Sequence, residues 1–584
     1  MASPAPSLTG GRWRLRPADP RGAERLAASL QLCPLTARVL SARGLGDPEE
    51  ARRFLDQSLD ALLDPSGMRD MDRAVDLVQH ALESGRRIRI YGDYDVDGVC
   101  ATALLVRALG GLGAQVDWYI PHRLDEGYGV NEEAVRQAAA EGVGLLITVD
   151  CGTTARRPVA VARELGLEVL ITDHHRPDQE LPEAVVVNPW RPDCPYPFKH
   201  LAGVGVAYKL VGALARARGL KEGAEQRFLD LVCLGTVADV VPLLGENRLF
   251  VHHGLRRLPG SPKRGLAALL AASGFTGPIG SRQVAFGLAP RINAAGRMEH
   301  AQAAVKLLLT DDRAEADQLA AYLCEQNQRR RAQEQETLAQ AEELLAREVD
   351  LAREKVIVLS SEAWHPGVIG IVASRLVERY HRPVLLVALT DGQGKGSGRS
   401  VAALNLWEAL RECAPLLERF GGHHYAAGFG VAADRVEALR QRVNEVADAR
   451  LTAEDLVREL EADTEAELSE LTPGAVRELD RLEPYGMGNP APLVITRGLG
   501  LAAAAPVGGG AHLVLRLRDD AGRGVEAIWF RRGDLLERLP TGVALDLCHR
   551  PRVEEWEGQV RVRLQVEDLR VAEAQPREAE GGRP

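Results

Sequence analysis

The sequence predicts an α/β protein: a domain built on a parallel sheet, a smaller α/β domain joined to it by a long helix, and a C-terminal β-barrel. Between residues 85 and 190, short apolar runs alternate with helical runs, as in a parallel sheet with helices on both faces. Residues 299–350 are dense in charge and have the pattern of one long helix. Beyond residue 510, short alternating strands with Gly-rich turns are typical of a small barrel.

Length and composition limit the class of protein. A chain of 584 residues is too long for one core, so we expect three or four domains. It has no apolar run near the ~18 residues that span a bilayer, and its N-terminus lacks an apolar signal core. The eight cysteines include no CxxC pair, which favours reduced thiols, a cytoplasmic location and no zinc ribbon. The net charge of −10 disfavours a general nucleic-acid coat but allows a local basic groove.

The predicted organisation follows from these patterns. We expect strands Ile88–Tyr91, Val116–Ile120, Leu145–Val149, Val169–Thr172 and Val185–Val187 in the first sheet. The predicted domains are a helical lead-in that packs on the first domain (1–80), the parallel-sheet domain (81–300), a connector helix (301–350), the second α/β domain (351–450), a hinge and barrel (451–575) and a disordered tail (576–584). The hinge contains the segment Glu483–Pro490, EPYGMGNP.

The stretch Ile88–Gly98, IRIYGDYDVDG, carries the strongest chemical signal. An apolar strand ends in Asp93, Asp95 and Asp97, and alternate residues of an extended chain point to one side. Three converging carboxylates repel one another unless divalent cations neutralise them. A solvated acidic turn is the alternative, and it is common for one or two aspartates rather than three.

Further ligands follow other strand ends of the same sheet. Asp150 lies in TVDCG, and His174 and His175 lie in TDHH. Asp239 lies instead in TVADVVPL, an apolar segment of a mainly helical region, where a carboxylate is unlikely to be buried without a partner. A single Asp after a strand is usually a cap, but ligands at successive carboxyl ends meet at one edge of the sheet. A carboxylate and imidazole site of this kind suits Mn²⁺ or Mg²⁺. We expect two ions that hydrolyse a phosphoester, with Asp150 as the bridge. His175 would contact a phosphate oxygen, and Asp93 would hold a ligand or bind metal directly. The sequence lacks GxSxG and a Cys/His pairing, which disfavours acyl transfer.

Several later segments suit phosphate or nucleic acid. APRINAAGRM, with Arg291 and Arg297, would allow a phosphate backbone to approach closely, or would form a helix–helix contact. We expect a Gly-rich turn at 391–400, DGQGKGSGRS, and a second Gly-rich segment, GGHHYAAGFG, to line a phosphate surface without Walker-A spacing. Arginines on the barrel beside Trp529, Phe530 and Trp556 would bind a single strand, unless the barrel has an ordinary wet face.

The motifs, taken together, resemble a known family. GDYDVDG, TVDCG, TDHHRP and TVADVVPL resemble the four motifs of the DHH phosphoesterase superfamily, and HPGVIGIVASRL, GSGRS and GGHHYAAGF resemble its DHHA1 domain. Their order, followed by a barrel, is similar to that of the RecJ-type exonucleases, which are specific for single-stranded DNA and act 5′→3′.

This resemblance implies roles for particular residues and partners. The metal ligands would be Asp95, Asp97, Asp150, His174 and Asp239, with Asp93 and His175 completing the catalytic motifs. Residues that bind the strand and its 5′-phosphate would be Arg123, Arg297, Ser397, Arg399 and His423. The barrel would be an OB-fold that grips single-stranded DNA. The product would be 5′-mononucleotides, made during DNA repair and recombination. The expected partners are a helicase and a single-strand-binding protein, with a monomeric chain and no membrane.

Two other functions are compatible with parts of the sequence. A DHH-type phosphodiesterase that cleaves nanoRNA or linear or cyclic dinucleotides would share the first two domains, but it would have no barrel. A non-catalytic DNA-replication scaffold would share the fold, but it would have lost metal ligands, whereas this chain keeps each expected Asp and His.

Overall fold

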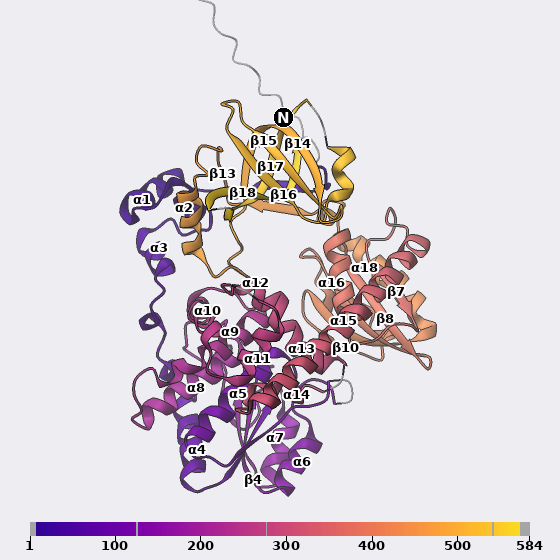
Figure 1. Ribbon diagram of the computed structural model, residues 1–584. Coiled ribbons are helices and arrows are strands. Elements are labelled where there is room, and N and C mark those ends of the chain that lie inside the picture. The colour runs from indigo at the N-terminus through magenta and orange to yellow at the C-terminus, as the bar shows by residue number, and fades with distance from the viewer. Residues whose placement is uncertain are drawn as a thin grey trace, which may run out of the picture.

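The computed structural model describes residues 7–123, 126–275, 277–298, 300–539, 542–556 and 558–572. It confirms the predicted fold class: a parallel-sheet domain, a smaller α/β domain and a barrel form separate bodies in Figure 1. No helix among the described residues is both long enough and apolar enough to cross a bilayer. The eight cysteines are all unpaired. The predicted disordered tail, 576–584, lies outside the described residues.

The first domain is built on a five-stranded, all-parallel sheet in the order β3-β2-β4-β5-β6. Alternate strand residues face opposite sides: Ile88 and Ile147 pack with α4, α5 and α8, while Leu146 and Ile171 pack with α6 and α7. The strands are β2 (Arg87–Gly92), β3 (Val116–Tyr119), β4 (Val143–Val149), β5 (Glu168–Thr172) and β6 (Val185–Val187). The helices are α4 (Met71–Glu83), α5 (Val96–Gly111), α6 (Glu132–Ala140), α7 (Arg156–Glu164) and α8 (Gly203–Ala217).

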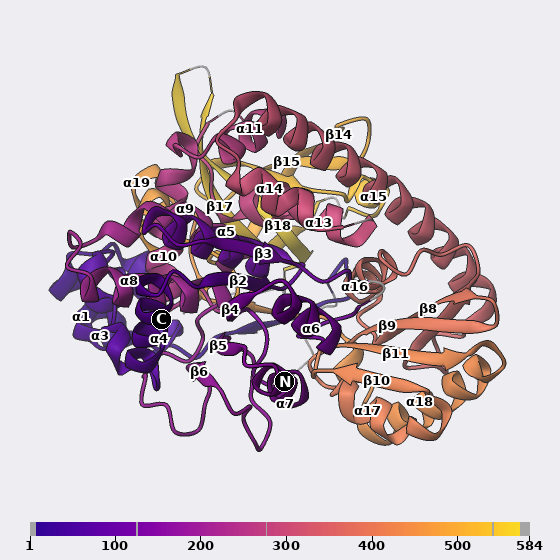
Figure 2. The same ribbon diagram turned by 90° about the horizontal axis from the view of Figure 1, so that it is seen from below.

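A layer of helices completes this domain and leads to the connector. These helices are α9 (Leu229–Ala238), α10 (Gly245–Arg257), α11 (Arg264–Ala272), α12 (Ser281–Gln283), α13 (Ala289–Met298) and α14 (Gln302–Leu309). The connector α15 (Arg313–Glu348) starts later than predicted, because Asp312 caps it by accepting a hydrogen bond from the Glu315 backbone N–H at 2.7 Å. Leu307 and Leu308 of α14 are buried in the first core, so residues 301–312 belong to that domain. Figure 2 shows α15 extending from the first domain to the second.

The second α/β domain has a five-stranded sheet in the order β10-β11-β9-β8-β7, in which only β7 and β8 pair in parallel. Its elements are β7 (Ile357–Ser361), α16 (Ile369–Tyr380), β8 (Val384–Thr390), β9 (Gln393–Arg399), α17 (Leu406–Glu412), β10 (Arg419–Gly422), β11 (Ala426–Ala432) and α18 (Val436–Arg450).

The Gly-rich segment 391–400 is mostly strand β9 rather than the predicted turn. A Cβ at Gly394 would lie 2.6 Å from a Val387 side-chain carbon, and one at Gly396 would overlap the Phe429 ring. The glycines therefore make room for the side chains of neighbouring strands. Alternation along the strand leaves Lys395, Ser397 and Arg399 on the other face.

The C-terminal domain is a barrel, because β14 pairs with both β15 and β17 and so closes the sheet. Its elements are β13 (Thr464–Glu465), α19 (Pro473–Glu478), β14 (Val494–Val507), β15 (His512–Arg518), β16 (Gly524–Trp529), β17 (Ala544–Trp556) and β18 (Gln559–Val571). The expectation that Trp529 faces a bound strand is wrong, because its ring is only 2% exposed in the barrel core. The next residue, Phe530, is 45% exposed. The side chain of Trp556 lies outside the described part of the chain.

The N-terminal segment corrects another expectation. Strand β1 (Arg12–Leu15) pairs in parallel with β12 (Glu459–Ala462). The helices α1 (Pro20–Leu30), α2 (Pro34–Ala42) and α3 (Pro48–Leu55) bury Leu26 and Leu35 in the same core as the barrel strands. Residues 8–55 therefore pack on the C-terminal domain rather than on the first domain. Within this N-terminal segment, Leu59 is the first residue that packs against the core of the first domain.

Candidate metal centre and phosphate site

The end of β2 and the start of α5 bring the three aspartates together. Asp95 is the N-cap of α5, and its Oδ1 accepts hydrogen bonds from the backbone N–H groups of Asp97 at 2.9 Å and Gly98 at 3.1 Å. A Cβ at Gly98 would lie 2.5 Å from the Asp93 carbonyl oxygen. Glycine at this position therefore allows the chain to fold back closely enough for the carboxylates to converge.

The N-terminus of α8 contacts the carboxylates of Asp97 and Asp150. The fully buried Asp97 accepts hydrogen bonds from the backbone N–H groups of Gly203 at 2.6 Å and Val204 at 2.9 Å. A Cβ at Gly203 would lie 2.7 Å from the Asp150 Cβ, so this glycine lets α8 pack directly on Asp150. Asp150 itself has φ of 61°, a left-handed conformation that Asp tolerates better than most residues.

Asp173 orients the two histidines that follow β5. Its carboxylate accepts hydrogen bonds from the backbone N–H groups of Thr153, His174 and His175, at 2.7–3.1 Å, and lies 2.8 Å from His175 Nδ1. Although burial raises the pKa of the Asp173 carboxyl, these hydrogen bonds and the His175 charge hold it below its usual range. Although burial lowers the pKa of His175, Asp173 outweighs it and raises the value to about 9. His175 is therefore a cation at neutral pH.

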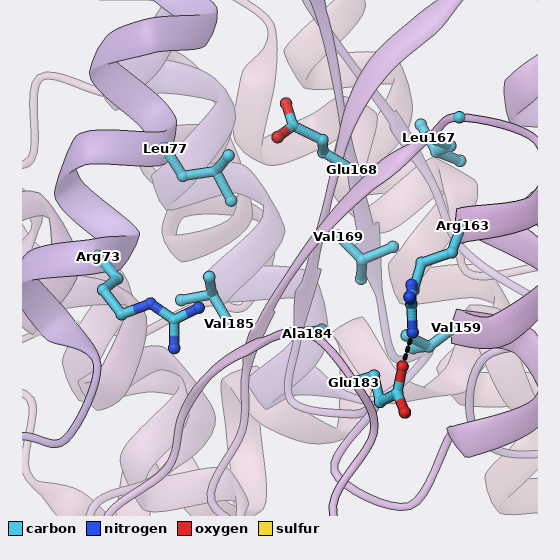
Figure 3. A pocket seen from close by; sticks show the side chains of 11 residues that line it. Arg73, Leu77, Val159, Arg163, Leu167, Glu168, Val169, Glu183, Ala184 and Val185 are labelled. Atoms are coloured by element: carbon cyan, nitrogen blue, oxygen red, sulfur yellow. Dashed lines mark ion pairs between the residues drawn. The ribbon is translucent and has the colours of Figure 1, made fainter.

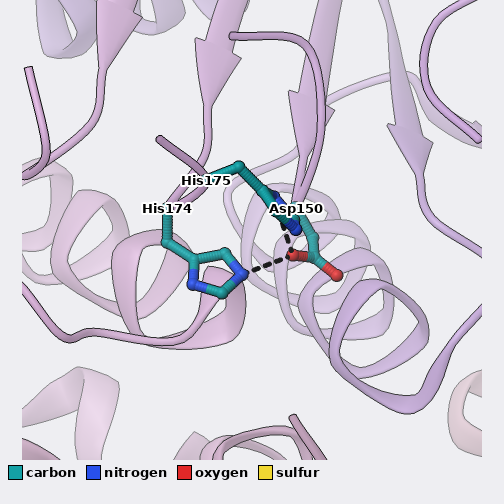
Figure 4. A group of neighbouring side chains, drawn as sticks. All are labelled: Asp150, His174 and His175. Carbon is teal, nitrogen blue, oxygen red and sulfur yellow. Dashed lines mark ion pairs between the residues drawn. The ribbon is translucent and has the colours of Figure 1, made fainter. Parts of the chain in front are cut away.

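His174 lies at the centre of the carboxylates. Its Nε2 is 3.0 Å from Asp150 Oδ1, 3.5 Å from Asp239 Oδ2 and 3.9 Å from Asp97 Oδ2. Figure 4 shows the His174 and His175 rings both directed at the Asp150 carboxylate. Three overlapping groups have ligand atoms within 4.8 Å of one another: Asp150–His174–His175, Asp97–His174–Asp239 and Asp93–Asp95–Asp150. Asp150 and His174 each belong to two of these groups, and of the two only the carboxylate has two oxygens with which to bridge two ions, so the role of Asp150 as the bridge stays a prediction.

These side chains fit a divalent metal ion. Asp93 Oδ1, Asp150 Oδ1, His174 Nε2 and Asp239 Oδ2 are buried without a hydrogen-bond partner. Burial and then the neighbouring Asp239 raise the pKa of Asp97 to about 7, and burial and then Asp95 raise the pKa of Asp239 to about 8. Burial also holds the pKa values of Asp93 and Asp150 well above their usual range. Bound cations would relieve the repulsion between these carboxylates and would give the unpaired oxygen atoms a partner.

Three guanidinium groups lie beside this cluster. The Arg123 guanidinium lies over the Tyr94 ring, 4.8 Å from its centre. Tyr94 stands between the candidate ligands Asp93 and Asp95 in the sequence. Burial, then Arg123 and other nearby arginines including Arg399, lower the pKa of Arg297 to about 9. Burial and then Arg123 also lower the pKa of Arg399. Guanidinium groups that destabilise one another in this way are arranged for an anion.

The two α/β domains meet at this basic group. Arg297 Nη1, at the end of α13, donates a hydrogen bond to the Gly367 carbonyl of the second domain at 3.2 Å. On β9, Arg399 Nη1 lies 3.3 Å from Ser397 Oγ. A Cβ at Gly370, in the first turn of α16, would lie 2.8 Å from that Ser397 Oγ, so the helix N-terminus faces both side chains. His423 is exposed in the turn between β10 and β11, and its role stays a prediction.

The structure also shows the contacts of two residues whose roles the sequence did not settle. Arg291 donates to the Gly287 carbonyl at 2.6 Å and to Cys324 Sγ at 3.3 Å, so it forms the helix–helix contact while Arg297 faces the basic group. Sequence reasoning missed Tyr128, whose Oη lies 3.0 Å from His175 Nδ1 and donates to the Asp150 carbonyl at 3.3 Å. Its segment, EGYGVN, contains no recognisable catalytic signal.

A separate hollow of about 560 Å³ lies at the other end of β5 and β6 (Figure 3). Its floor is apolar, with Leu77, Leu167 and Val169, and Arg163 and Glu183 form an ion pair at its rim. It has no contact with the carboxylate cluster, because Glu168 and Val169 begin β5 whereas His174 and His175 follow its end.

Comparison with known proteins gives the family. Residues 87–236 match the DHH family N-terminal domain, residues 353–449 match the DHHA1 domain, and residues 462–568 match the RecJ OB domain. The chain is 40% identical to the single-stranded-DNA-specific exonuclease RecJ of Bacillus subtilis, over 97% of this chain and 71% of that relative. This chain belongs to the RecJ family. The RecJ of Thermus thermophilus is 41% identical over 96% of this chain and 79% of the relative, and that of Dickeya dadantii is 38% identical over 92% and 96%.

Solved RecJ structures agree with the fold and the cofactor. The crystal structure of Thermus thermophilus RecJ in complex with Mn²⁺ superposes with a TM-score of 0.84 at 39% identity, over 96% of this chain and 80% of that one. The corresponding Mg²⁺ complex gives 0.77 at 37% identity, over 96% and 79%. The prediction of Mn²⁺ or Mg²⁺ is therefore confirmed for the RecJ family, and the number of ions in this site stays a prediction.

Proposed function

We propose that this chain is a metal-dependent exonuclease that degrades single-stranded DNA 5′→3′ to 5′-mononucleotides, in DNA repair and recombination. The main support is one juxtaposition: a cluster of carboxylates and imidazole with orphaned ligand atoms lies directly beside three mutually repelling guanidinium groups. The first group suits hard cations, and the second suits a phosphate.

The metal ligands would be Asp95, Asp97, Asp150, His174 and Asp239, with Asp150 shared between two ions. Bound there, a pair of divalent cations supplies an activated water and stabilises the attacking and leaving oxygens of a phosphodiester displacement. His175, protonated because Asp173 raises its pKa, would donate to a non-bridging oxygen of the scissile phosphate. Asp173 keeps the His175 ring in position, and Asp93, whose buried Oδ1 has no hydrogen-bond partner, would hold a ligand or bind metal directly.

The direction of cleavage would follow from the basic group. Arg123, Arg297 and Arg399 would bind the terminal 5′-phosphate as a dianion, which relieves the repulsion that lowers the pKa values of Arg297 and Arg399. The Ser397 hydroxyl lies beside Arg399 and would donate a further hydrogen bond. With the 5′ end held beside the metal site, the reactive phosphodiester is the one that releases the terminal nucleotide.

The barrel favours a polymer over a dinucleotide as substrate. Arg516 and Arg518 are exposed on β15, and Phe530 is exposed just beyond β16, so the barrel carries both charges for phosphates and a ring for stacking. A helicase and a single-strand-binding protein remain the proposed partners, and a monomer remains the proposed state. The family resemblance alone supports these partners.

One digestion experiment tests the proposal. Strands labelled at either end, with a 5′-phosphate or a 5′-hydroxyl, are digested with Mn²⁺ or Mg²⁺, beside a dinucleotide and a blunt duplex. We expect mononucleotides from the 5′ end of the phosphorylated single strand and at least tenfold slower loss of the other substrates. Faster cleavage of the dinucleotide would favour the small-substrate phosphodiesterase, and no cleavage at all would favour a scaffold.

A point variant separates the chemistry from strand binding. Asp97→Ala should abolish cleavage while leaving strand binding in EDTA nearly unchanged, because Asp97 is buried in the metal cluster and away from the barrel. Asp76→Ala, at an exposed carboxylate of α4, is the matched control and should keep the wild-type rate. Cleavage that persists in Asp97→Ala would contradict the ligand assignment.

A further inference from the structure

A turn of the C-terminal domain presses on the loop that carries a candidate metal ligand. The turn is Gly486–Asn489, within the hinge segment EPYGMGNP, and the loop is Val240–Leu244, which follows Asp239. The Leu243 backbone N–H donates to the Met487 carbonyl at 2.8 Å. A Cβ at Gly488 would lie 3.1 Å from the Pro242 Cβ. Two segments that are far apart in the sequence thus meet three to four residues beyond Asp239.

The loop adopts a conformation that it would not keep unaided. Val240 has φ of 62°, which is strongly disfavoured for a β-branched residue. Its side chain is 57% exposed, so its own packing does not hold it there. On the inner side, Asn247 of α10 donates to the Pro242 carbonyl at 3.0 Å. On the outer side, the contact is the Gly486–Asn489 turn. The strained backbone beside Asp239 is therefore held from both sides.

The turn itself is built as a rigid part of the C-terminal domain. Asn489 is buried, and its side chain donates to the carbonyls of Leu482 at 2.8 Å and Pro484 at 3.0 Å. Its Oδ1 accepts a hydrogen bond from Arg43 at 2.7 Å, and Arg43 pairs with Asp463 at 2.9 Å. Because the turn is anchored in this way, it keeps its place in the C-terminal domain, and the loop must adapt to the turn rather than the turn to the loop.

We infer that the Gly486–Asn489 turn positions Asp239 for metal binding, so that the C-terminal domain sets the metal affinity of the first domain as well as holding the strand. The inference rests on the proposed function, because it takes Asp239 to be a ligand. Residues of the turn are positioning residues: they touch the loop, and none of them belongs to the groups of candidate ligands.

Two glycines of the C-terminal domain provide a matched test. Gly488 and Gly498 have nearly equal left-handed φ angles, 71° and 70°, but a Cβ at Gly498 meets nothing within 4 Å. Alanine at either site strains the backbone alike, and only Gly488→Ala pushes on Pro242. Mn²⁺ affinity, measured from the electron paramagnetic resonance signal of free Mn²⁺, should fall about tenfold in Gly488→Ala, as is usual for a lost supporting contact. It should stay within about twofold of wild type in Gly498→Ala, and strand binding in EDTA should be unchanged in both. Equal Mn²⁺ affinity in the two variants would overturn the inference.

A second measurement needs no substitution. By thermodynamic reciprocity, a turn that favours metal binding is itself stabilised by the metal. Hydrogen exchange of wild-type peptides covering 482–491 should slow on addition of Mn²⁺, while a peptide from 512–518 on the same barrel should not change. If the exchange rate of the 482–491 peptides did not change on addition of Mn²⁺, the inference would be overturned, even if Gly488→Ala failed to fold. If wild-type protein bound no Mn²⁺ and cut no strand, the proposed function would fail first, which is a separate outcome.

Discussion

Replacing Gly203 by alanine should damage the metal centre while leaving the fold intact. The new Cβ would lie 2.7 Å from the Asp150 Cβ and 2.8 Å from Asp150 Oδ1. Ordinary carbon contacts are about 3.5–4.0 Å, so Asp150 or α8 must move by roughly 1 Å. The Gly203 backbone N–H also donates to Asp97, so a shift of α8 disturbs two candidate ligands at once. Alanine otherwise suits a helix better than glycine by about 0.5–1 kcal/mol, which favours a folded variant.

The expected loss can be stated as a rate. A misplacement of about 1 Å in a catalytic group typically costs about 100-fold, or about 2.7 kcal/mol of transition-state stabilisation. Single-turnover digestion of a 5′-phosphorylated strand in saturating Mn²⁺ measures this loss, and circular dichroism checks the fold. Gly205→Ala, two residues along the same helix, is the control. Its Cβ would meet only Leu201 and Phe250 side-chain atoms at 3.4–3.6 Å. A wild-type rate in Gly203→Ala, or an equal loss in Gly205→Ala, would refute the reasoning.

Further predictions follow from the site and the barrel. Because the raised pKa values of Asp97 and Asp239, about 7 and about 8, make the metal-free folded state bind more protons than the unfolded state, its stability should fall as pH rises from about 4 to 8. Mn²⁺ binding at pH 7 should release protons, measured by calorimetry in buffers of different ionisation enthalpy, and a release of zero would contradict the assignment. Arg399→Ala should raise KM for 5′-phosphorylated strands about tenfold or more, with a smaller change for 5′-hydroxyl strands, and equal changes would argue against a terminal-phosphate role. Trp529→Ala should lower the free energy of unfolding by about 3–5 kcal/mol, because its ring is buried in the barrel, whereas Phe530→Ala should weaken strand binding and leave thermal stability unchanged.

Removing the metal should lower the stability of the protein mainly because the clustered carboxylates then repel one another. The cluster brings together at least four carboxyls whose pKa values are raised, and burial is the first cause for each. A bound cation stabilises the folded state in proportion to its affinity and concentration. The metal-free protein should therefore melt at a lower temperature than the Mn²⁺-bound protein, with a gap that widens from pH 6 to pH 8. His175 acts in the same direction as the carboxyls of the metal-free state: its raised pKa contributes stability that is complete below about pH 6.5 and is lost as pH rises through about 9.

The sequence by itself determined the order of the domains and the location of the chemistry. Apolar runs of strand length fixed the first sheet, since a buried parallel strand must be almost continuously apolar. Asp93, Asp95 and Asp97 follow one such strand, and Asp150 and His174 follow two others, so their meeting at one edge follows from the geometry of parallel sheets. Local rules were sufficient for these candidate ligands because each lies within a few residues of the strand that positions it. Asp239 is different, because it is the C-cap of helix α9 and reaches the cluster through helix packing.

Only the tertiary structure decided contacts between distant segments. The pairing of β1 with β12, the burial of Trp529 and the opposite fates of Arg291 and Arg297 depend on which surfaces meet, and local periodicity does not specify that. The same is true of β9, whose glycines have the composition of a turn but are a strand because Val387 and Phe429 occupy the space that side chains would fill. The contact between Met487 and Leu243 belongs to this class as well. A hydrogen bond between two backbone groups does not depend on residue identity, so only folding brings that turn to the loop beside the candidate ligand Asp239.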